Sequence, residues 1–278
     1  MAKITLRDAV PGHPDYRFSE PINLDIPKDN NVAIIGPNGA GKSVLVDIII
    51  GSKLCRKGSL VSITDGDVEL PSDQIKYMSF RDIYSMADNK PTYYQQRWNA
   101  TENEETPMVI DILGSENCKR HADLIESLAI GGILEKRLIL LSSGETRKMQ
   151  IFRALLGMPK LIVIDNPYIG LDAESRDVVN ELLKKISAEG IQVILVLCNP
   201  ADIPPMVQTV VPVEKMRCLG AVSIDKFMAD KKLHEQLFGV AEPQFSLPTT
   251  AARQLERPYE NAVIMNKVNV RYFTKQIL

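Results

Sequence analysis

The segment from Gly36 to Ser43 carries the strongest chemical pattern in the sequence. It runs Gly36-Pro37-Asn38-Gly39-Ala40-Gly41-Lys42-Ser43, is followed by Val44, and fits G-x-x-x-x-G-K-[ST] between an apolar run and a predicted helix. Glycines let the backbone turn its N–H groups toward a phosphate chain, and the helix adds the positive end of its dipole. We expect Lys42 to reach the β- and γ-phosphates of a nucleoside triphosphate and Ser43 to bind Mg²⁺. The structural alternative is a glycine-rich turn with a surface lysine.

A second candidate is Asp165, which ends the apolar run Leu161-Ile162-Val163-Ile164. Such a run is typical of a strand buried in a parallel sheet. Ligands of these sheets bind at the carboxyl ends of the strands, so Asp165 is placed to hold Mg²⁺ beside the phosphate loop. Many buried strands end in aspartate, and this interpretation therefore depends on the loop at residues 36–43.

The run Leu141-Ser142-Ser143-Gly144-Glu145 stands directly before a predicted helix. Serine and glutamate at this spacing are typical of a helix N-cap, which is the structural alternative for this segment. Together with the phosphate loop and Asp165, the run resembles the Leu-Ser-Gly-Gly-Gln signature of the ATP-binding cassette (ABC) ATPases. The match departs at Ser143, where the signature has glycine, and at Glu145, where it has glutamine.

The resemblance to ABC ATPases covers about residues 1–230. After Asp165, the run Asn166-Pro167-Tyr168-Ile169-Gly170-Leu171-Asp172 is similar to the segment that leads into the family's D-loop. The resemblance implies an α/β fold, a P-loop NTPase of ABC type with a mixed-sheet core, an antiparallel β subdomain and an inserted helical subdomain. It also implies ATP and Mg²⁺ as cofactors, with residues 36–44 around the phosphates.

The same resemblance implies a site shared between two cassettes. Two domains pack head to tail, and each ATP lies on the phosphate loop of one domain and is capped by the signature of the other, here residues 142–145. An aromatic residue ahead of the first hairpin stacks on adenine in the family. Tyr16 is the first candidate and Phe18 the second, and an aromatic packed at a strand edge is the structural alternative.

Two positions depart from the family's catalytic residues. Asn166 stands where the family has a general-base glutamate, and Asn199 where it has a histidine that contacts the γ-phosphate. An asparagine amide orients water but cannot accept its proton, and loss of a general base costs about 10²–10⁴-fold in rate. We expect ATP binding through Lys42 with slow hydrolysis, unless Asp172 or Glu174 supplies the base.

The family's Mg²⁺-binding glutamine has two candidate positions in this sequence. Arg81 stands where the family has glutamine, directly after the strand-like run 75–80, and Gln95 stands farther on, next to Gln96. An insertion that shifts the glutamine downstream would make Gln95 the metal ligand. A plain surface cluster is the alternative.

Short apolar runs between turn residues predict the elements that position these side chains. We expect a helix from Lys42 to Ile50 and strands at residues 3–6, 22–26, 32–35, 61–64, 75–80, 161–164 and 193–197. A helix over 174–188 carries Val178, Leu182, Leu183 and Ile186 at helical spacing and links two of the strands. Strand–helix–strand units of this kind are typical of α/β folds.

Changes in composition along the chain predict its domain organisation. We expect residues 1–241 to form the domain that resembles an ABC ATP-binding domain, with a helical insert at about 81–140, and the proline-containing stretch 242–261 to be a linker. In both Tyr16–Ile22 and Tyr272–Leu278 an aromatic stands six residues before an apolar residue. This repetition predicts that residues 262–278 are the first strand of a second, truncated ABC domain. A strand that completes the first domain is the alternative.

Composition excludes several classes of protein. Hydrophobic residues make up 45% and charged residues 24%, as in globular chains, and a net charge of -2 argues against a general nucleic-acid coat protein. The apolar runs are too short to span a bilayer and the first residues lack a signal-peptide pattern, so we expect a cytoplasmic protein, at the inner membrane face when bound to a permease. Buried, inert thiols are expected for the four cysteines, Cys55, Cys118, Cys198 and Cys218.

Two functions fit these patterns. The first is an ATPase domain whose dimer closure drives a transporter with its permease on separate chains; a narrower resemblance to tandem ATPases of molybdenum transport or photorepair makes molybdate the candidate solute. The second is a non-transport ABC ATPase that gates binding to ribosomes or nucleic acid. The absence of coiled-coil heptads and of a basic stripe in the sequence favours the transporter. Simple binding of another phosphate compound does not explain residues 141–145.

Overall fold

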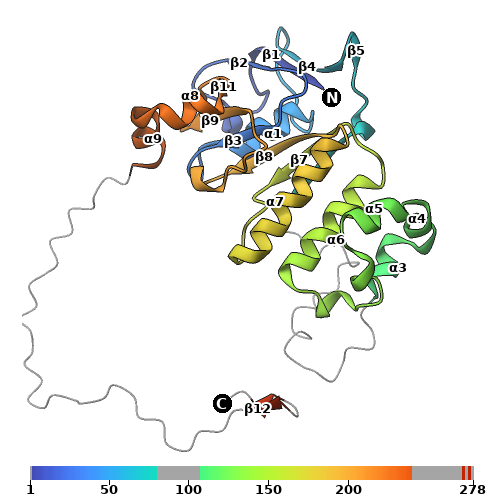
Figure 1. Ribbon diagram of the computed structural model, residues 1–278. Helices are drawn as coiled ribbons and strands as arrows, with labels where there is room; N and C mark the ends of the chain where they lie inside the picture. Colours follow the sequence, from blue (N-terminus) through green and yellow to red (C-terminus); the bar gives the residue numbers. More distant parts are fainter. Residues whose placement is uncertain (1, 80–106, 240–270, 273–274, 277–278) are drawn as a thin grey trace, which may run out of the picture. The chain divides into compact units, whose positions relative to one another are not determined.

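A largely parallel sheet lies at the centre of the fold. The computed structural model describes residues 2–79, 107–239, 271–272 and 275–276, and its central strand order is β10-β9-β3-β8-β7-β6, with β11 also paired to β9 (Figure 1). The strands are β3 (Val32–Ile35), β6 (Ile75–Ser79), β7 (Leu161–Asp165), β8 (Gln192–Leu197), β9 (Thr209–Glu214), β10 (Arg217–Cys218) and β11 (Val222–Ser223). Since β9, β3, β8, β7 and β6 pair in parallel, their carboxyl ends meet at one edge.

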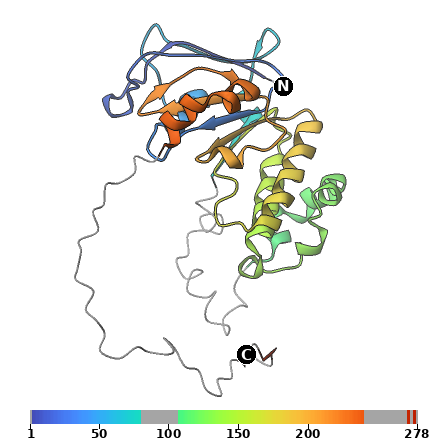
Figure 2. The same ribbon diagram turned by 60° about the vertical axis from the view of Figure 1, so that its left-hand side comes forward.

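A second, antiparallel sheet is formed mainly by the N-terminal residues. Its order is β2-β1-β4-β5, with β1 (Lys3–Ala9), β2 (Ile22–Ile26), β4 (Leu60–Asp65) and β5 (Val68–Glu69). Side chains of β2 alternate strictly between buried and exposed, as expected when one face of a sheet packs on the core and the other meets solvent. Figure 2 shows this sheet and the helices of residues 109–155 at opposite ends of the unit.

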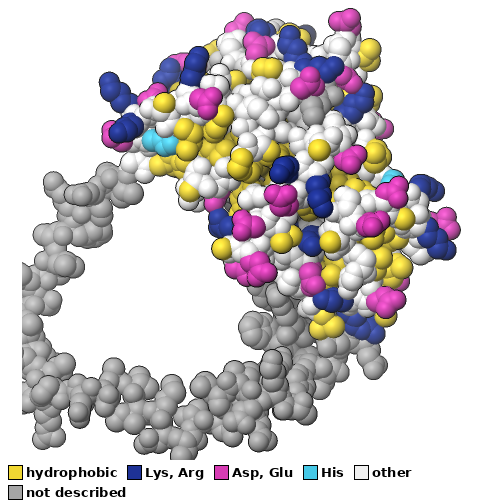
Figure 3. All heavy atoms as spheres, viewed as in Figure 1, with side chains coloured by type: hydrophobic (Ala, Val, Ile, Leu, Met, Phe, Trp, Pro, Cys, Tyr) yellow, Lys and Arg dark blue, Asp and Glu magenta, His cyan; other side chains and the backbone are white. Residues whose placement is uncertain are grey.

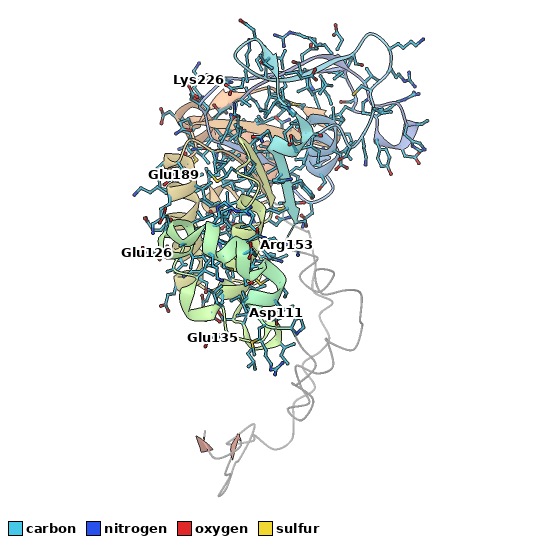
Figure 4. The ribbon with its side chains drawn as sticks, turned by 90° about the vertical axis from the view of Figure 1, so that its right-hand side faces the viewer. Asp111, Glu126, Glu135, Arg153, Glu189 and Lys226 are labelled. Atoms are coloured by element: carbon cyan, nitrogen blue, oxygen red, sulfur yellow. The ribbon has the colours of Figure 1, made fainter. Side chains whose placement is uncertain are left out.

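Helices cover the parallel sheet and extend from it. The longer ones are α1 (Lys42–Ile49), α6 (Ser143–Leu155), α7 (Ala173–Ala188) and α9 (Lys231–Phe238), and the shorter α8 (Ile224–Ala229) directly precedes α9. Between β6 and α6 stand α3 (Val109–Leu113), α4 (Ser115–Arg120) and α5 (Ala122–Ser127), which form the described part of the helical insert. The 3₁₀ turns are η1 (Pro14–Tyr16), η2 (Ser72–Gln74), η5 (Gly131–Ile133), η6 (Leu138–Leu140) and η7 (Pro200–Asp202). Figure 4 labels Asp111, Glu126 and Glu135 on the insert and Arg153 on α6.

Two hydrophobic clusters lie on the two faces of the parallel sheet. Alternate residues of β3 enter different clusters: Ala33 and Ile35 join the side of α6 and α7, and Val32 and Ile34 join the side of α1 and the antiparallel sheet. All four side chains are fully buried. A strand buried on both faces must be apolar throughout, which explains the unbroken Val32–Ile35 run.

Most predicted elements are confirmed within one to three residues at their ends, and the α/β class is confirmed. The predicted apolar face of α7 is wrong at one position, because Val179 is fully buried whereas Val178 is 37% exposed. Strand β9 was not predicted, although it pairs with all four residues of β3. Only Cys118 is a buried thiol as expected, since Cys55, Cys198 and Cys218 are partly exposed.

The chain divides into one unit of residues 1–239 and another of residues 240–278. Within the second unit, β12 (Arg271–Tyr272) and β13 (Lys275–Gln276) pair antiparallel, where the sequence predicts one strand over 262–278. The linker prediction at 242–261 lies outside the described residues. Among the described helices none combines the length and apolarity needed to cross a bilayer. On the face drawn in Figure 3, acidic and basic side chains are interspersed, in keeping with the small net charge.

Candidate functional site

The phosphate loop connects β3 to α1, as the pattern predicts. Gly39 and Gly41 have φ values of 79° and 105°, which glycine adopts without the steric penalty of other residues. The Lys42 side chain folds back into the loop and donates to the carbonyl oxygens of Gly36 (2.8 Å) and Pro37 (2.9 Å). Its residue is 6% exposed, whereas Ser43, at the start of α1, is exposed. The ammonium and the hydroxyl thus lie on the turn that the pattern assigns to phosphate and metal.

The turn between β9 and β10 braces this loop, which the sequence patterns did not indicate. The Met216 amide donates to the Ala40 carbonyl at 2.8 Å, and the Ser19 amide donates to the Met216 carbonyl at 2.7 Å. A Cβ at Gly36 would lie 2.0 Å from the carbonyl oxygen of Val213. Gly36 is therefore required by close packing against β9, and the loop's shape depends on residues far along the chain.

Asp165 lies at the carboxyl end of β7, separated from β3 only by β8. The carboxylate is 6% exposed and one of its oxygens accepts a hydrogen bond from the Tyr77 hydroxyl at 3.3 Å. Burial and the neighbouring Asp165 charge raise the pKa of Tyr77 to about 12, so the phenol remains a donor at neutral pH. The sequence analysis missed Tyr77. The alternation of side chains along β6 could have indicated this contact. Tyr77 lies on the same face of the strand as Ser79, and Ser79 pairs with Asp165 on β7.

The donor set at this edge fits a magnesium ion. A serine hydroxyl at the start of α1 and a carboxylate at the end of β7 are oxygen ligands, which Mg²⁺ prefers, and the ion keeps waters and substrate phosphates as its other ligands. Ser43 and Asp165 are the residues that would hold it. Gln95, the third predicted ligand, and its alternative Arg81 lie outside the described residues.

Asn166 adopts a left-handed conformation (φ 51°) directly after β7. Its amide nitrogen donates to Asp165 at 2.7 Å, and its amide oxygen lies 3.5 Å from the Cys198 sulfur. The same sulfur lies 3.1 Å from the amide oxygen of Asn38 in the phosphate loop. Asn166 thus links Asp165, the predicted metal ligand, to the phosphate loop through Cys198. Of the residues in this link, Asp165 alone has a carboxylate that could take a proton from water.

Asn199 follows β8 and begins η7, where its side-chain oxygen accepts the Ala201 amide at 3.1 Å. Asp202 in the same turn pairs with Arg176 of α7 at 2.5 Å. Asp172, one of the alternative bases, accepts the Ser175 amide at 2.9 Å as the N-cap of α7. Hydrogen bonds from Ser175 lower the pKa of Asp172, so this carboxylate is a helix cap and a weakened base. Glu174 lies exposed in the first turn of the same helix.

The signature-like segment forms the beginning of α6. Ser142 caps the helix, with its hydroxyl accepting the Glu145 amide at 3.2 Å and its own amide donating to the Glu145 carboxylate at 2.9 Å. Ser142 and Ser143 are exposed, and Gly144 is buried. A Cβ at Gly144 would meet the Ser175 hydroxyl at 3.2 Å, so α6 begins close against the start of α7. The capping alternative is therefore confirmed, with both serines exposed, and the signature role of this segment stays a prediction.

Glu145 carries a charge that a neighbouring cation compensates. Its second carboxylate oxygen accepts the Lys136 ammonium at 2.6 Å. Partial burial opposes ionisation of Glu145, but the Lys136 ammonium and the Ser142 amide outweigh it and hold the pKa of Glu145 below its usual value. Lys136 was not singled out from the sequence, since the pair is separated by the turn η6.

The two aromatic candidates for adenine stacking lie in different environments. Tyr16 ends η1 and is 39% exposed, with the Lys53 ammonium 4.3 Å from the centre of its ring. Phe18 is 8% exposed, and its ring tip would lie 3.4 Å from a Cβ at Gly41. Phe18 therefore packs beneath the loop and offers no open face, which leaves Tyr16 as the candidate.

Comparisons with known proteins agree with this geometry. Residues 19–169 match the family described as ABC transporter. The chain is 27% identical over 280 residues to the ABC transporter ATP-binding protein ModF of Escherichia coli, covering 95% of this chain and 54% of that protein. It is 30% identical over 197 residues to the energy-coupling factor transporter ATP-binding protein EcfA of Methanothermobacter thermautotrophicus, covering 69% of this chain and 61% of that protein.

A solved structure supports the fold. The cbiO1 protein of Clostridium perfringens, described as part of the ABC transporter complex cbiONQ, superposes with a TM-score of 0.63 at 19% sequence identity. The superposition covers 84% of this chain and 93% of that protein. At this level of identity the likeness concerns the arrangement of strands and helices.

Proposed function

The chain belongs to the ABC transporter family, and we propose that it is a cassette that binds Mg-ATP on its own phosphate loop and pairs head to tail with a second cassette. The observation that carries this proposal is the start of α6, where the cap leaves Ser142 and Ser143 exposed. Serines exposed at a helix N-terminus suit a phosphate group. The phosphate loop with Lys42 supplies the other half of a composite site, and the second cassette is either another copy of this chain or a domain joined to it.

The residues around the phosphate loop have the following roles in the proposed function. Lys42 and the loop amides hold the phosphate chain, Ser43 and Asp165 hold the metal, and Tyr77 orients Asp165 through its hydroxyl. Bound Mg-ATP supplies the anhydride bond whose cleavage accompanies opening of the dimer. Because Asn166 cannot accept a proton, the site on this loop retains ATP and hydrolyses it slowly.

We propose further that ATP closure drives a membrane permease carried on separate chains. The matched relatives are named as ATP-binding proteins of transporters, which supports this coupling. Molybdate is the candidate solute, on the narrower resemblance to tandem ATPases of molybdenum transport. This chain spans about half of the ModF protein, so the solute and the partner both belong to the proposal.

A complementation experiment tests the head-to-tail pairing. One variant, Lys42→Ala, loses the phosphate-loop cation. The other, Ser143→Glu, places a negative charge on the signature face, where it favours the helix dipole but repels a phosphate. Mixing the two variants leaves one dimer arrangement in which an intact loop faces an intact signature.

Sedimentation or light scattering with Mg-ATP gives the readout. We expect the wild-type chain to dimerise with ATP, each variant alone to remain monomeric, and the mixture to dimerise at a higher ATP concentration than the wild type. If the Ser143→Glu chain alone dimerises as well as the wild type does, the signature does not cap the ATP of a partner. A mixture that stays monomeric while the wild type dimerises would also contradict the pairing.

A further inference from the structure

Glu145 places a carboxylate on the helix N-terminus that is proposed to face the γ-phosphate of the partner's ATP. We propose that Lys136 is the positioning residue that neutralises this carboxylate and so keeps the signature face open to a phosphate. The inference rests on the proposed function, since it concerns the same composite site. It assigns a task to a residue that lies outside the signature itself.

The geometry of the pair commits both oxygens of the carboxylate. One accepts the Lys136 ammonium at 2.6 Å, and the other accepts the Ser142 amide at 2.9 Å. The side chains are 44% exposed for Lys136 and 26% exposed for Glu145. The pair therefore lies at the surface on which a phosphate would arrive, with the carboxylate turned to its own helix cap and to the lysine.

The backbone fixes the place of Lys136. Its amide donates to the Ile133 carbonyl at 3.0 Å, and its carbonyl accepts the Val109 amide at 3.0 Å. The backbone of Lys136 is thus held by hydrogen bonds to η5 and to α3. Glu135, the preceding residue, lies at the end of the helical insert away from Lys226 (Figure 4).

Electrostatics explains why such a residue is needed. A helix N-terminus binds anions through its free amides and the positive end of its dipole. A carboxylate in the first turn competes for the same potential and repels an incoming phosphate. Glutamine, which the family signature has at this position, brings no charge. The charges of Glu145 and Lys136 likewise sum to zero, so the pair takes the place of the uncharged glutamine side chain.

Charge substitutions separate this role from simple support of the helix cap. Lys136→Met leaves the carboxylate uncompensated, Glu145→Gln leaves the cation alone, and the double variant restores neutrality. The proposal predicts the affinity order Glu145→Gln, then wild type and the double variant together, then Lys136→Met. A lysine that only supports the fold gives a different order, because the double variant would then be as poor as Lys136→Met.

The measurement is the Mg-ATP concentration for half-maximal dimerisation of the 278-residue chain. We expect Lys136→Met to raise it about three- to tenfold at low salt, and the deficit to shrink toward 1 M salt because screening removes the repulsion. The matched control is Lys148→Met, which removes a lysine from the second turn of α6, the helix that carries Glu145. We expect its half-maximal Mg-ATP concentration to stay within about twofold of wild type. Thermal unfolding of each variant without nucleotide verifies that it is folded.

The outcomes divide cleanly. A wild-type chain that does not dimerise with Mg-ATP overturns the proposed function and this inference with it. A wild type that dimerises, with Lys136→Met matching it, overturns the inference alone. So does a folded Lys136→Met chain whose deficit is unchanged by salt and is not repaired by adding Glu145→Gln.

Discussion

The Asn166 amide lies between Asp165 and Cys198, at the position where the proposed function expects a proton acceptor. Its hydrogen bonds hold the side chain against the end of β7, and its left-handed backbone is one that asparagine tolerates better than most residues. The residue is therefore built into the site as a structural link. The chemistry it lacks is proton acceptance.

Replacing this residue tests that statement. Asn166→Glu restores a base, and we expect ATP turnover at saturating Mg-ATP to rise by about 10²- to 10⁴-fold. Asn166→Gln is the matched control, because it has the length and backbone preference of glutamate without the carboxylate. Equal turnover of the two variants, measured by phosphate release, would mean that the base lies elsewhere.

Several single residues of the site could be predicted and others could not. Lys42, Ser43 and Asp165 follow from local patterns because a phosphate loop and a strand end are encoded in consecutive residues. Tyr77 lies on β6 and Cys198 directly follows β8. Their contacts with Asp165, Asn166 and Asn38 depend on the parallel register, which no single segment specifies.

At the scale of elements, the phosphate loop is held from outside as well as by its own glycines. The β9–β10 turn contacts it at Ala40, and β9 leaves no room for a side chain at Gly36. Strand β9 escaped prediction because its apolar run is broken by Pro212, whereas β3 is an unbroken apolar run. The conformation of the phosphate loop therefore depends on β9, a strand that the sequence patterns did not predict.

Two glycine substitutions measure this dependence. Gly36→Ala would place a methyl group 2.0 Å from the Val213 carbonyl oxygen, and we expect it to lower the free energy of unfolding by about 3 kcal/mol. Gly39→Ala meets open space and suffers only from its positive φ, so about 1–2 kcal/mol is expected. Urea denaturation of both variants gives the comparison, and a smaller loss at Gly36 would contradict the bracing by β9.

The helices show how far periodicity alone reaches. The spacing of apolar residues located α7 to within one residue at its start, but it chose Val178 for the buried face where Val179 is buried. Both valines fit a helical repeat, and the direction in which α7 faces the sheet decides between them. That direction is set by the packing of α7 on the sheet and on α6, which is a tertiary property.

At the scale of the whole molecule, one chain carries both segments that the proposed function assigns to the two halves of a nucleotide site. The loop half has Lys42 buried against carbonyl oxygens, and the signature half has serines exposed on a capped helix. Patterns in the sequence located both segments, since each is a short motif, and their roles in binding ATP stay predictions. They did not predict the Lys136–Glu145 pair, because it joins residues across a 3₁₀ turn whose path the sequence does not reveal.

The proposed function depends on Mg-ATP binding at the loop of residues 36–43, and calorimetric titration of the chain with ATP measures this binding. With Mg²⁺ present we expect one ATP per chain in the wild type, at least tenfold weaker binding in Lys42→Ala, and weaker binding to the wild type when EDTA removes the metal, because Ser43 and Asp165 would hold the ion that neutralises the phosphates. Binding that is undiminished in a folded Lys42→Ala chain, or no binding by the wild type, would contradict the account.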